Sequence, residues 1–191
     1  MQSPGQSLTF GRMIADSRTS VAFTGHRTYR GAAADALRRT VGELYARGFR
    51  NFLSGMAVGF DLAAAEAVLE LRERAPGVRL VAAVPFRGQE MRFSPADRER
   101  FRRVLAEADS VEVLAPAYHR GCYAVRNDFL VYNARVLVAW YDGSPGGTRY
   151  TVRRALGRGL EVVNLCPAAP VPPAPSSDKK AARRPRVVGR L

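Results

Sequence analysis

Cysteine, acidic residues and long apolar runs are scarce in this chain of 191 residues. The 2 cysteines, Cys122 and Cys166, are far apart and no C-x-x-C pair occurs, so the sequence indicates neither a disulfide framework nor a zinc site. No stretch approaches the roughly 18 consecutive apolar residues of a membrane span, and residues 1–20 lack the apolar centre of a secretory signal. We therefore expect a cytoplasmic protein that binds no metal and does not associate with membranes.

Acidic residues are outnumbered by basic ones. The chain has 30 Lys and Arg against 17 Asp and Glu, which gives a formal net charge of +13. This charge attracts polyanions, and it fits a nucleotide ligand, a nucleic acid or simply an arginine-rich proteome. The hydrophobic content of 47% is that of an ordinary soluble protein, and the length predicts one domain with a full core.

The composition divides the chain into three segments. Residues 1–19 are polar and aperiodic, which predicts a flexible N-terminal segment, and residues 20–167 are predicted to form the folded domain. Residues 168–191 are rich in Pro, Ala, Lys and Arg, which predicts a basic disordered tail. The tail could contact nucleic acid or an acidic partner, or it could be a solvated end without a specific role.

Strand-like and helix-like patterns alternate through the folded segment. Strands are predicted at residues 21–24, 51–53, 78–84, 110–114, 135–141 and 160–166, and helices at 35–47, 62–74, from 95 onward, 123–134 and 148–158. Ser94 followed by Pro95 is typical of a helix start with the serine as its cap. The alternation predicts an α/β fold with a mostly parallel sheet flanked by helices.

Glycine marks the ends of the first two predicted strands, in TGHR at residues 24–27 and in SGMAVGFD at residues 54–61. Glycine lets backbone N–H groups approach an oxyanion closely, and the first turn of a helix offers unpaired N–H groups at the positive end of its dipole. Arg27 adds a fixed cation, while His26 could bind a ligand or serve only in the turn. Asp61 would repel phosphate, so it is expected to accept a ribose hydroxyl or to cap the helix.

Three other segments near strand ends carry polar or aromatic residues. Phe86 could stack on a base with Gln89 beside it, although a buried core phenylalanine has the same signature. The glycine pair in DGSPGGT at residues 142–148 could hold a second anion with its backbone N–H groups, although this is also good turn chemistry. Asn127, on a predicted helix, could reach the same pocket.

The loops that follow parallel strands meet at the carboxyl edge of a sheet, where open α/β proteins bind their ligands. We therefore expect these segments to form one pocket for a nucleotide or an ADP-ribose-like ligand. The predicted ligand-binding residues are Thr24, Gly25, His26, Arg27, Ser54, Gly55, Gly59, Asp61, Pro85, Phe86, Gln89, Arg126, Asn127, Asp142, Gly146, Gly147 and Thr148.

Five motifs taken in order resemble the YpsA-like family of the SLOG superfamily, which is named for the SMF/DprA and LOG proteins. They are TGHR, SGMAVGFDLAAAE, VPF-x-x-Q, RND and VAWYDGSPGGTRYTVRRA, and the similarity runs from about Val21 to Pro167. The resemblance implies a Rossmann-like three-layer sandwich that binds a nucleotide or a nucleotide-derived ligand, such as ADP-ribose or NAD, as a sensor or adaptor.

Other branches of the superfamily imply two alternatives. LOG enzymes cleave the base from a nucleoside monophosphate with a glutamate in PGG-x-GT-x-x-E, but the matching stretch from Pro145 to Arg154 has no acid there. A nucleotide N-glycosidic hydrolase would have to use Asp61, Glu66 or Asp142 instead, because this reaction needs a carboxylate. The DNA-processing branch binds single-stranded DNA, which requires aromatic rings along a basic groove, and the sequence shows no interleaved aromatic stripe.

Overall fold

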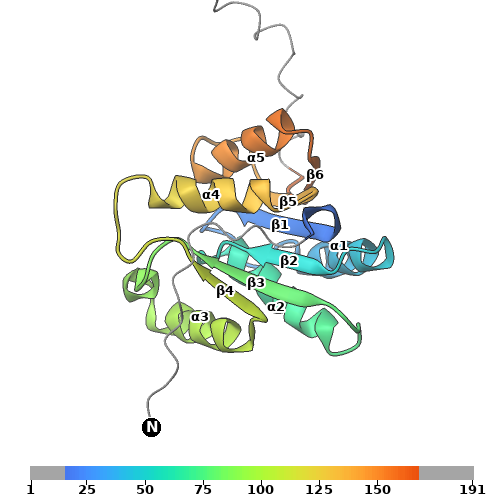
Figure 1. Ribbon diagram of the computed structural model, residues 1–191, viewed down its shortest axis with the longest axis horizontal. Helices are drawn as coiled ribbons and strands as arrows, with labels where there is room; N and C mark the ends of the chain where they lie inside the picture. Colours follow the sequence, from blue (N-terminus) through green and yellow to red (C-terminus); the bar gives the residue numbers. More distant parts are fainter. Residues whose placement is uncertain (1–15, 168–191) are drawn as a thin grey trace, which may run out of the picture.

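Six parallel strands form the centre of the protein, for which the computed structural model describes residues 16–167 (Figure 1). The strands are β1 (Ser20–Gly25), β2 (Asn51–Ser54), β3 (Arg79–Val84), β4 (Ser110–Val113), β5 (Val136–Trp140) and β6 (Glu161–Asn164). The helices are α1 (Ala34–Ala46), α2 (Phe60–Arg72), α3 (Pro95–Glu107), α4 (Cys122–Tyr132) and α5 (Gly147–Gly157), with two 3-10 turns, η1 (Ser17–Thr19) and η2 (Gln89–Arg92).

The strand order is β4-β3-β2-β1-β5-β6, so the chain reverses its direction across the sheet after β4. Each neighbouring pair of strands is parallel. Right-handed crossovers therefore place α1, α2 and α3 on one face and α4 and α5 on the other. Packing agrees with this, because α2 contacts both α1 and α3 while α4 contacts α5. The predicted Rossmann-like three-layer sandwich is confirmed, and the described sheet is entirely parallel.

Side chains alternate between the two faces of the sheet, as the strand repeat requires. On β1, Val21 and Phe23 belong to the apolar cluster beneath α1, α2 and α3, whereas Ala22 belongs to the cluster beneath α4 and α5. Phe23 stacks on Phe52 of β2 with ring centroids 6.3 Å apart. Apolar side chains on both faces explain why the central strands are continuous hydrophobic runs.

The predicted strands and helices all occur, with shifts of one or two residues at their ends. α2 begins at Phe60 rather than Leu62, and its cap is Gly59, which makes no side-chain cap hydrogen bond. The alternative that Asp61 caps this helix is therefore wrong. Ser94 does cap α3, since its Oγ accepts a hydrogen bond of 3.1 Å from the Asp97 N–H.

The two ends of the chain are described only in part. Residues 17–19 of the segment predicted to be flexible form η1, where the Ser20 Oγ donates a 2.7 Å hydrogen bond to the Asp16 carbonyl. Residues 1–15 and the predicted basic tail at 168–191 lie outside the described residues. No helix within residues 16–167 is long and apolar enough to cross a membrane.

A matched pair of glycine variants tests the packing between β1 and α2. A Cβ on Gly25 would overlap the Phe60 ring, whereas a Cβ on Gly42 in α1 meets nothing within 4 Å. We expect Gly25→Ala to lower the free energy of unfolding by about 1–3 kcal/mol through overpacking. Gly42→Ala should raise it by about 0.5–1 kcal/mol because alanine favours the helix.

Urea denaturation of the two variants measures both effects on the same scale. Equal stability of Gly25→Ala and the wild-type protein would contradict the close approach of β1 to Phe60.

Candidate functional site

A cavity of about 360 Å³ opens at the carboxyl ends of β1 and β5, the two strands between which the strand order reverses. We name it the switch-point cavity. It is lined by Thr24, Gly25, His26, Arg27, Asp61, Arg126, Asn127, Gly147 and Thr148, all of them predicted ligand-binding residues, and by Ala57 and Tyr123. The structure thus brings together residues from the end of β1 and the loop after it, from the loop after β2, and from α2, α4 and the start of α5. This is the edge where such folds bind ligands.

Arg126 forms the floor of the switch-point cavity and is only 6% exposed. Its guanidinium donates hydrogen bonds to the Gly55 carbonyl and, over 2.8 Å, to Asn127 Oδ1. The same group lies 3.4 Å from Asp61 Oδ2. Arg126 therefore joins α4 on one face of the sheet to the loop that begins α2 on the other face.

Asp61 lies beside Arg126 in the first turn of α2 and is 3% exposed. Burial raises the pKa of its carboxyl from 3.8 to about 6, although the Arg126 charge and the nearby backbone N–H of Ala57 act in the opposite direction. Among the described residues, Asp61 Oδ1 has no hydrogen-bond partner. A buried carboxyl with a free oxygen at a cavity wall is poised to accept a hydrogen bond from a ligand hydroxyl or to exchange a proton.

The N-terminus of α5 also forms a wall of the cavity, beside Asn127. Gly146 precedes it with a φ of 142°, a backbone conformation that favours glycine. The first turn of α5 contains no acidic residue, and its N–H groups have no partners within the helix. Thr148 adds a hydroxyl at the cavity. This wall therefore presents several hydrogen-bond donors and a positive dipole end to an anion.

The rim of the cavity carries His26, Arg27 and Asp142. His26 Nε2 lies 2.8 Å from Asp142 Oδ1 and accepts a 3.3 Å hydrogen bond from the Asp142 backbone N–H. Ser144, and to a smaller extent His26, lower the pKa of the Asp142 carboxyl. Arg27 is exposed, and its guanidinium lies 5.2 Å from the centroid of the Tyr123 ring. Within residues 16–167, His26 thus contacts Asp142, whereas Arg27 makes no ion pair.

Predicted residues of the loop after β2 have roles within the protein. Ser54 is fully buried, and its Oγ donates a 2.8 Å hydrogen bond to the Asp61 carbonyl. A Cβ on Gly55 would overlap Arg126 and Asp61, and a Cβ on Gly59 would overlap the backbone of His26 and Arg27. Close packing of protein atoms explains these two glycines, which do not line the cavity.

The predicted base-stacking group also lies away from the cavity. Pro85 and Phe86 are buried, and the Phe86 ring, 3% exposed, lies beneath Tyr118 and Tyr123. The Gln89 Nε2 donates a 2.6 Å hydrogen bond to the Met56 carbonyl. The aromatic residue that lines the cavity is Tyr123 and not Phe86, which the sequence suggested. The sequence could have indicated Tyr123, because it is an aromatic residue shortly before Arg126 and Asn127 on the same predicted helix.

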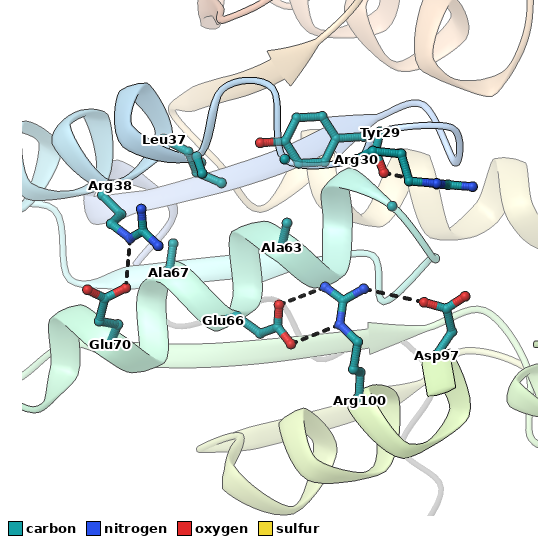
Figure 2. A pocket seen from close by; sticks show the side chains of 13 residues that line it. Tyr29, Arg30, Leu37, Arg38, Ala63, Glu66, Ala67, Glu70, Asp97 and Arg100 are labelled. Carbon is teal, nitrogen blue, oxygen red and sulfur yellow. Dashed lines mark hydrogen bonds and ion pairs between the residues drawn. The ribbon is translucent and has the colours of Figure 1, made fainter. Parts of the chain in front are cut away.

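A larger hollow of about 530 Å³ lies between α1, α2 and α3 (Figure 2). Most of its charged side chains are paired, as Arg38 lies 3.0 Å from Glu70 and Arg100 lies 2.7 Å from Glu66. Arg30, which also lines the hollow, donates hydrogen bonds to the carbonyls of Arg27 and Tyr29 instead. Glu66 is also paired with Arg103. The switch-point cavity, at the carboxyl edge of the sheet where such folds bind ligands, is the candidate site.

Within residues 16–167, no group of three His, Cys, Asp or Glu side chains could hold a metal ion.

Comparisons with known proteins agree with this fold. A family model described as the YspA SLOG family matches residues 22–159. A UPF0398 protein of Shouchella clausii is 38% identical over 94 residues, which are 48% of this chain and 50% of that protein. A UPF0398 protein of Halalkalibacterium halodurans is 29% identical over 126 residues, which are 64% and 67% of the two chains. The match to the first of these relatives spans half of its length.

Two solved structures of DNA processing protein A have a similar fold. The Streptococcus pneumoniae protein superposes with a TM-score of 0.55 and 19% identity, over 75% of this chain and 48% of its own. The Helicobacter pylori protein, whose single-stranded DNA binding mode has been described, superposes with a TM-score of 0.57 and 18% identity, over 75% and 63%. At this identity the likeness concerns the fold alone.

The raised pKa of Asp61 predicts a particular pH dependence of stability. Because the folded protein holds the Asp61 proton more tightly than the unfolded chain does, the contribution of this group to stability falls as pH rises from about 4 to about 7. Each pKa unit corresponds to about 1.4 kcal/mol. Asp61→Asn cannot ionise, so its free energy of unfolding relative to the wild-type protein should increase over this range.

Urea denaturation at several pH values measures the difference, and Asp35→Asn is the control because the Asp35 side chain is 86% exposed. A difference between Asp61→Asn and wild type that stays constant with pH would contradict a buried, weakly acidic Asp61.

Proposed function

The chain belongs to the YspA SLOG family, and from this membership and the switch-point cavity we propose that it binds a nucleotide or a nucleotide-derived ligand. ADP-ribose and NAD are examples of such ligands. In this proposal the protein acts as a sensor or adaptor, and the ligand's phosphate lies against the N-terminus of α5.

One observation carries this proposal: the N-terminus of α5, the exposed Arg27 and the buried Arg126 all line one cavity. The first turn of α5 offers backbone N–H groups without a neighbouring acid. Arg27 and Arg126 line the same cavity, and Arg27 makes no ion pair within residues 16–167. An anion placed there would receive charge-assisted hydrogen bonds from both sides.

The size of the cavity also supports a small ligand. Small-molecule sites occupy roughly 300–1,000 Å³, and the switch-point cavity, at about 360 Å³, is near the lower end of this range. A phosphate and a sugar would fill much of that volume. We therefore expect the remainder of the ligand to extend past the rim.

A second candidate function is hydrolysis of the N-glycosidic bond of a nucleotide. Of the three acids that could replace the missing LOG glutamate, Glu66 is paired with arginines in the hollow between the helices, and Asp142 lies on the rim beside His26. Only Asp61 lines the cavity, and its pKa of about 6 suits proton transfer near neutral pH.

The position of Gly147 allows a direct test of phosphate binding. A Cβ there would lie 3.7 Å from Asn127 Nδ2, an ordinary contact, so a side chain can begin at this position without a clash. Gly147→Asp adds a negative charge at the anion site, and at a helix N-terminus this charge does not destabilise the fold. We expect at least about tenfold weaker nucleotide binding for Gly147→Asp and nearly unchanged binding for Gly147→Ala.

Calorimetric titration with AMP, ADP, NAD, ADP-ribose, cyclic dinucleotides and short single-stranded DNA gives the affinities of the wild-type protein and both variants. Equal affinity of the Gly147→Asp variant for the preferred ligand would refute phosphate binding at α5. Binding of DNA alone, with a steep loss on adding salt, would assign the protein to nucleic-acid binding instead.

The hydrolase candidate makes its own prediction about product. If Asp61 transfers a proton in the reaction, incubation with AMP should release free adenine, and Asp61→Asn should reduce the rate by about 100-fold or more. Chromatography of the reaction mixture measures the base. If the wild-type protein binds AMP but releases no adenine, AMP hydrolysis is excluded and the sensor proposal remains.

A further inference from the structure

A row of aromatic rings and guanidinium groups extends from the switch-point cavity toward η2. The Arg27 guanidinium lies 5.2 Å from the Tyr123 ring, and the Arg92 guanidinium lies 4.5 Å from the Tyr118 ring at the other end. Between them, the Phe86 ring is 5.8 Å from Tyr123 and 5.4 Å from Tyr118. We name the three rings of Phe86, Tyr118 and Tyr123 the aromatic shelf.

Exposure increases along the aromatic shelf. Phe86 is buried, Tyr123 is half-buried at the cavity wall, and Tyr118 is 52% exposed. Phe86 meets both tyrosine rings edge to face, at 76° in each case, a favourable arrangement for aromatic pairs. The buried ring thus supports two rings above it, and Tyr118 keeps a large surface in solvent.

The charge around the aromatic shelf is unbalanced. Neither Arg27 nor Arg92 forms an ion pair with any residue between 16 and 167. By contrast, acids are paired with Arg38 of α1, Arg72 of α2 and Arg100 of α3. Arginines that stack on tyrosines and are not neutralised make a surface suited to an anionic ligand that carries a planar ring. Tyr29, which lines the hollow between the helices (Figure 2), differs because it is buried and meets the rings of Phe60 and Trp140 edge to face.

The geometry points to the aromatic shelf as the site for the base of the ligand, an inference that rests on the proposed phosphate site at α5. The centroids of Tyr118 and Tyr123 are 6.4 Å apart, so Tyr118 adjoins a ring that lines the cavity. The ligand then spans the carboxyl edge of the sheet from α5 to the loop after β4. Its phosphate lies at α5, its sugar in the cavity and its base against Tyr118, with Arg92 beside it.

Two probes that differ only in the base test this inference, namely AMP and ribose 5-phosphate. In the wild-type protein, AMP should bind at least about tenfold more tightly than ribose 5-phosphate, the effect expected of one stacking contact. Tyr118→Ala should remove most of this advantage and leave ribose 5-phosphate binding unchanged. Tyr118→Phe keeps the ring and should bind AMP within about twofold of the wild-type protein.

Calorimetry supplies the affinities, and thermal unfolding checks that the exposed Tyr118 can be replaced without loss of the fold. If the wild-type protein binds both probes equally, or if Tyr118→Ala weakens both or neither, the base does not lie on the aromatic shelf and the phosphate site stands. If the wild-type protein binds neither probe, the phosphate site and this inference fail together for mononucleotides.

Discussion

The buried pair of Asp61 and Arg126 is the interaction on which the site depends. Arg126 comes from α4 and Asp61 from α2, so the pair connects the two helical layers across the carboxyl edge of the sheet. A buried charge left alone is strongly destabilising. Within residues 16–167, the partners of the Arg126 guanidinium are Asp61, Asn127 and the Gly55 carbonyl. These contacts join α4 to the loop after β2 through Gly55. They also hold Asn127 beside Gly147 at the start of α5.

This arrangement also explains the electrostatic character of the site. Burial raises the pKa of Asp61 and opposes its ionisation, while Arg126 keeps its charge because a guanidinium is not deprotonated in proteins. In the proposed function, Arg27 and the positive end of the α5 dipole both favour an anion in the cavity. The aromatic shelf continues the same edge of the sheet outward, which gives a ligand with a base a second surface to contact.

Much of the fold and part of the site could be predicted from the sequence, because both depend on local pattern. Hydrophobic runs bounded by glycine predicted the strands. The residues after β1 and β5 were expected in one pocket because the carboxyl ends of parallel strands meet at one edge of the sheet. The role of Gly55 could not be predicted from the sequence. A larger residue there would overlap Arg126, which lies 71 positions away in the chain. The aromatic shelf was missed for the same reason, because Phe86, Tyr118 and Arg92 become neighbours only through the packing of η2 against the loop after β4.

The measurement that tests the central claim most directly is an NMR titration of the ¹⁵N-labelled protein with ADP-ribose, observed at the backbone N–H of Gly147 and Thr148 and at the Arg27 Nε–H. The account predicts that these signals shift together and saturate at one ligand equivalent, because phosphate accepts hydrogen bonds from the α5 turn. Shifts confined to the hollow between α1, α2 and α3, or no shift at Gly147 and Thr148 under saturating ligand, would contradict it.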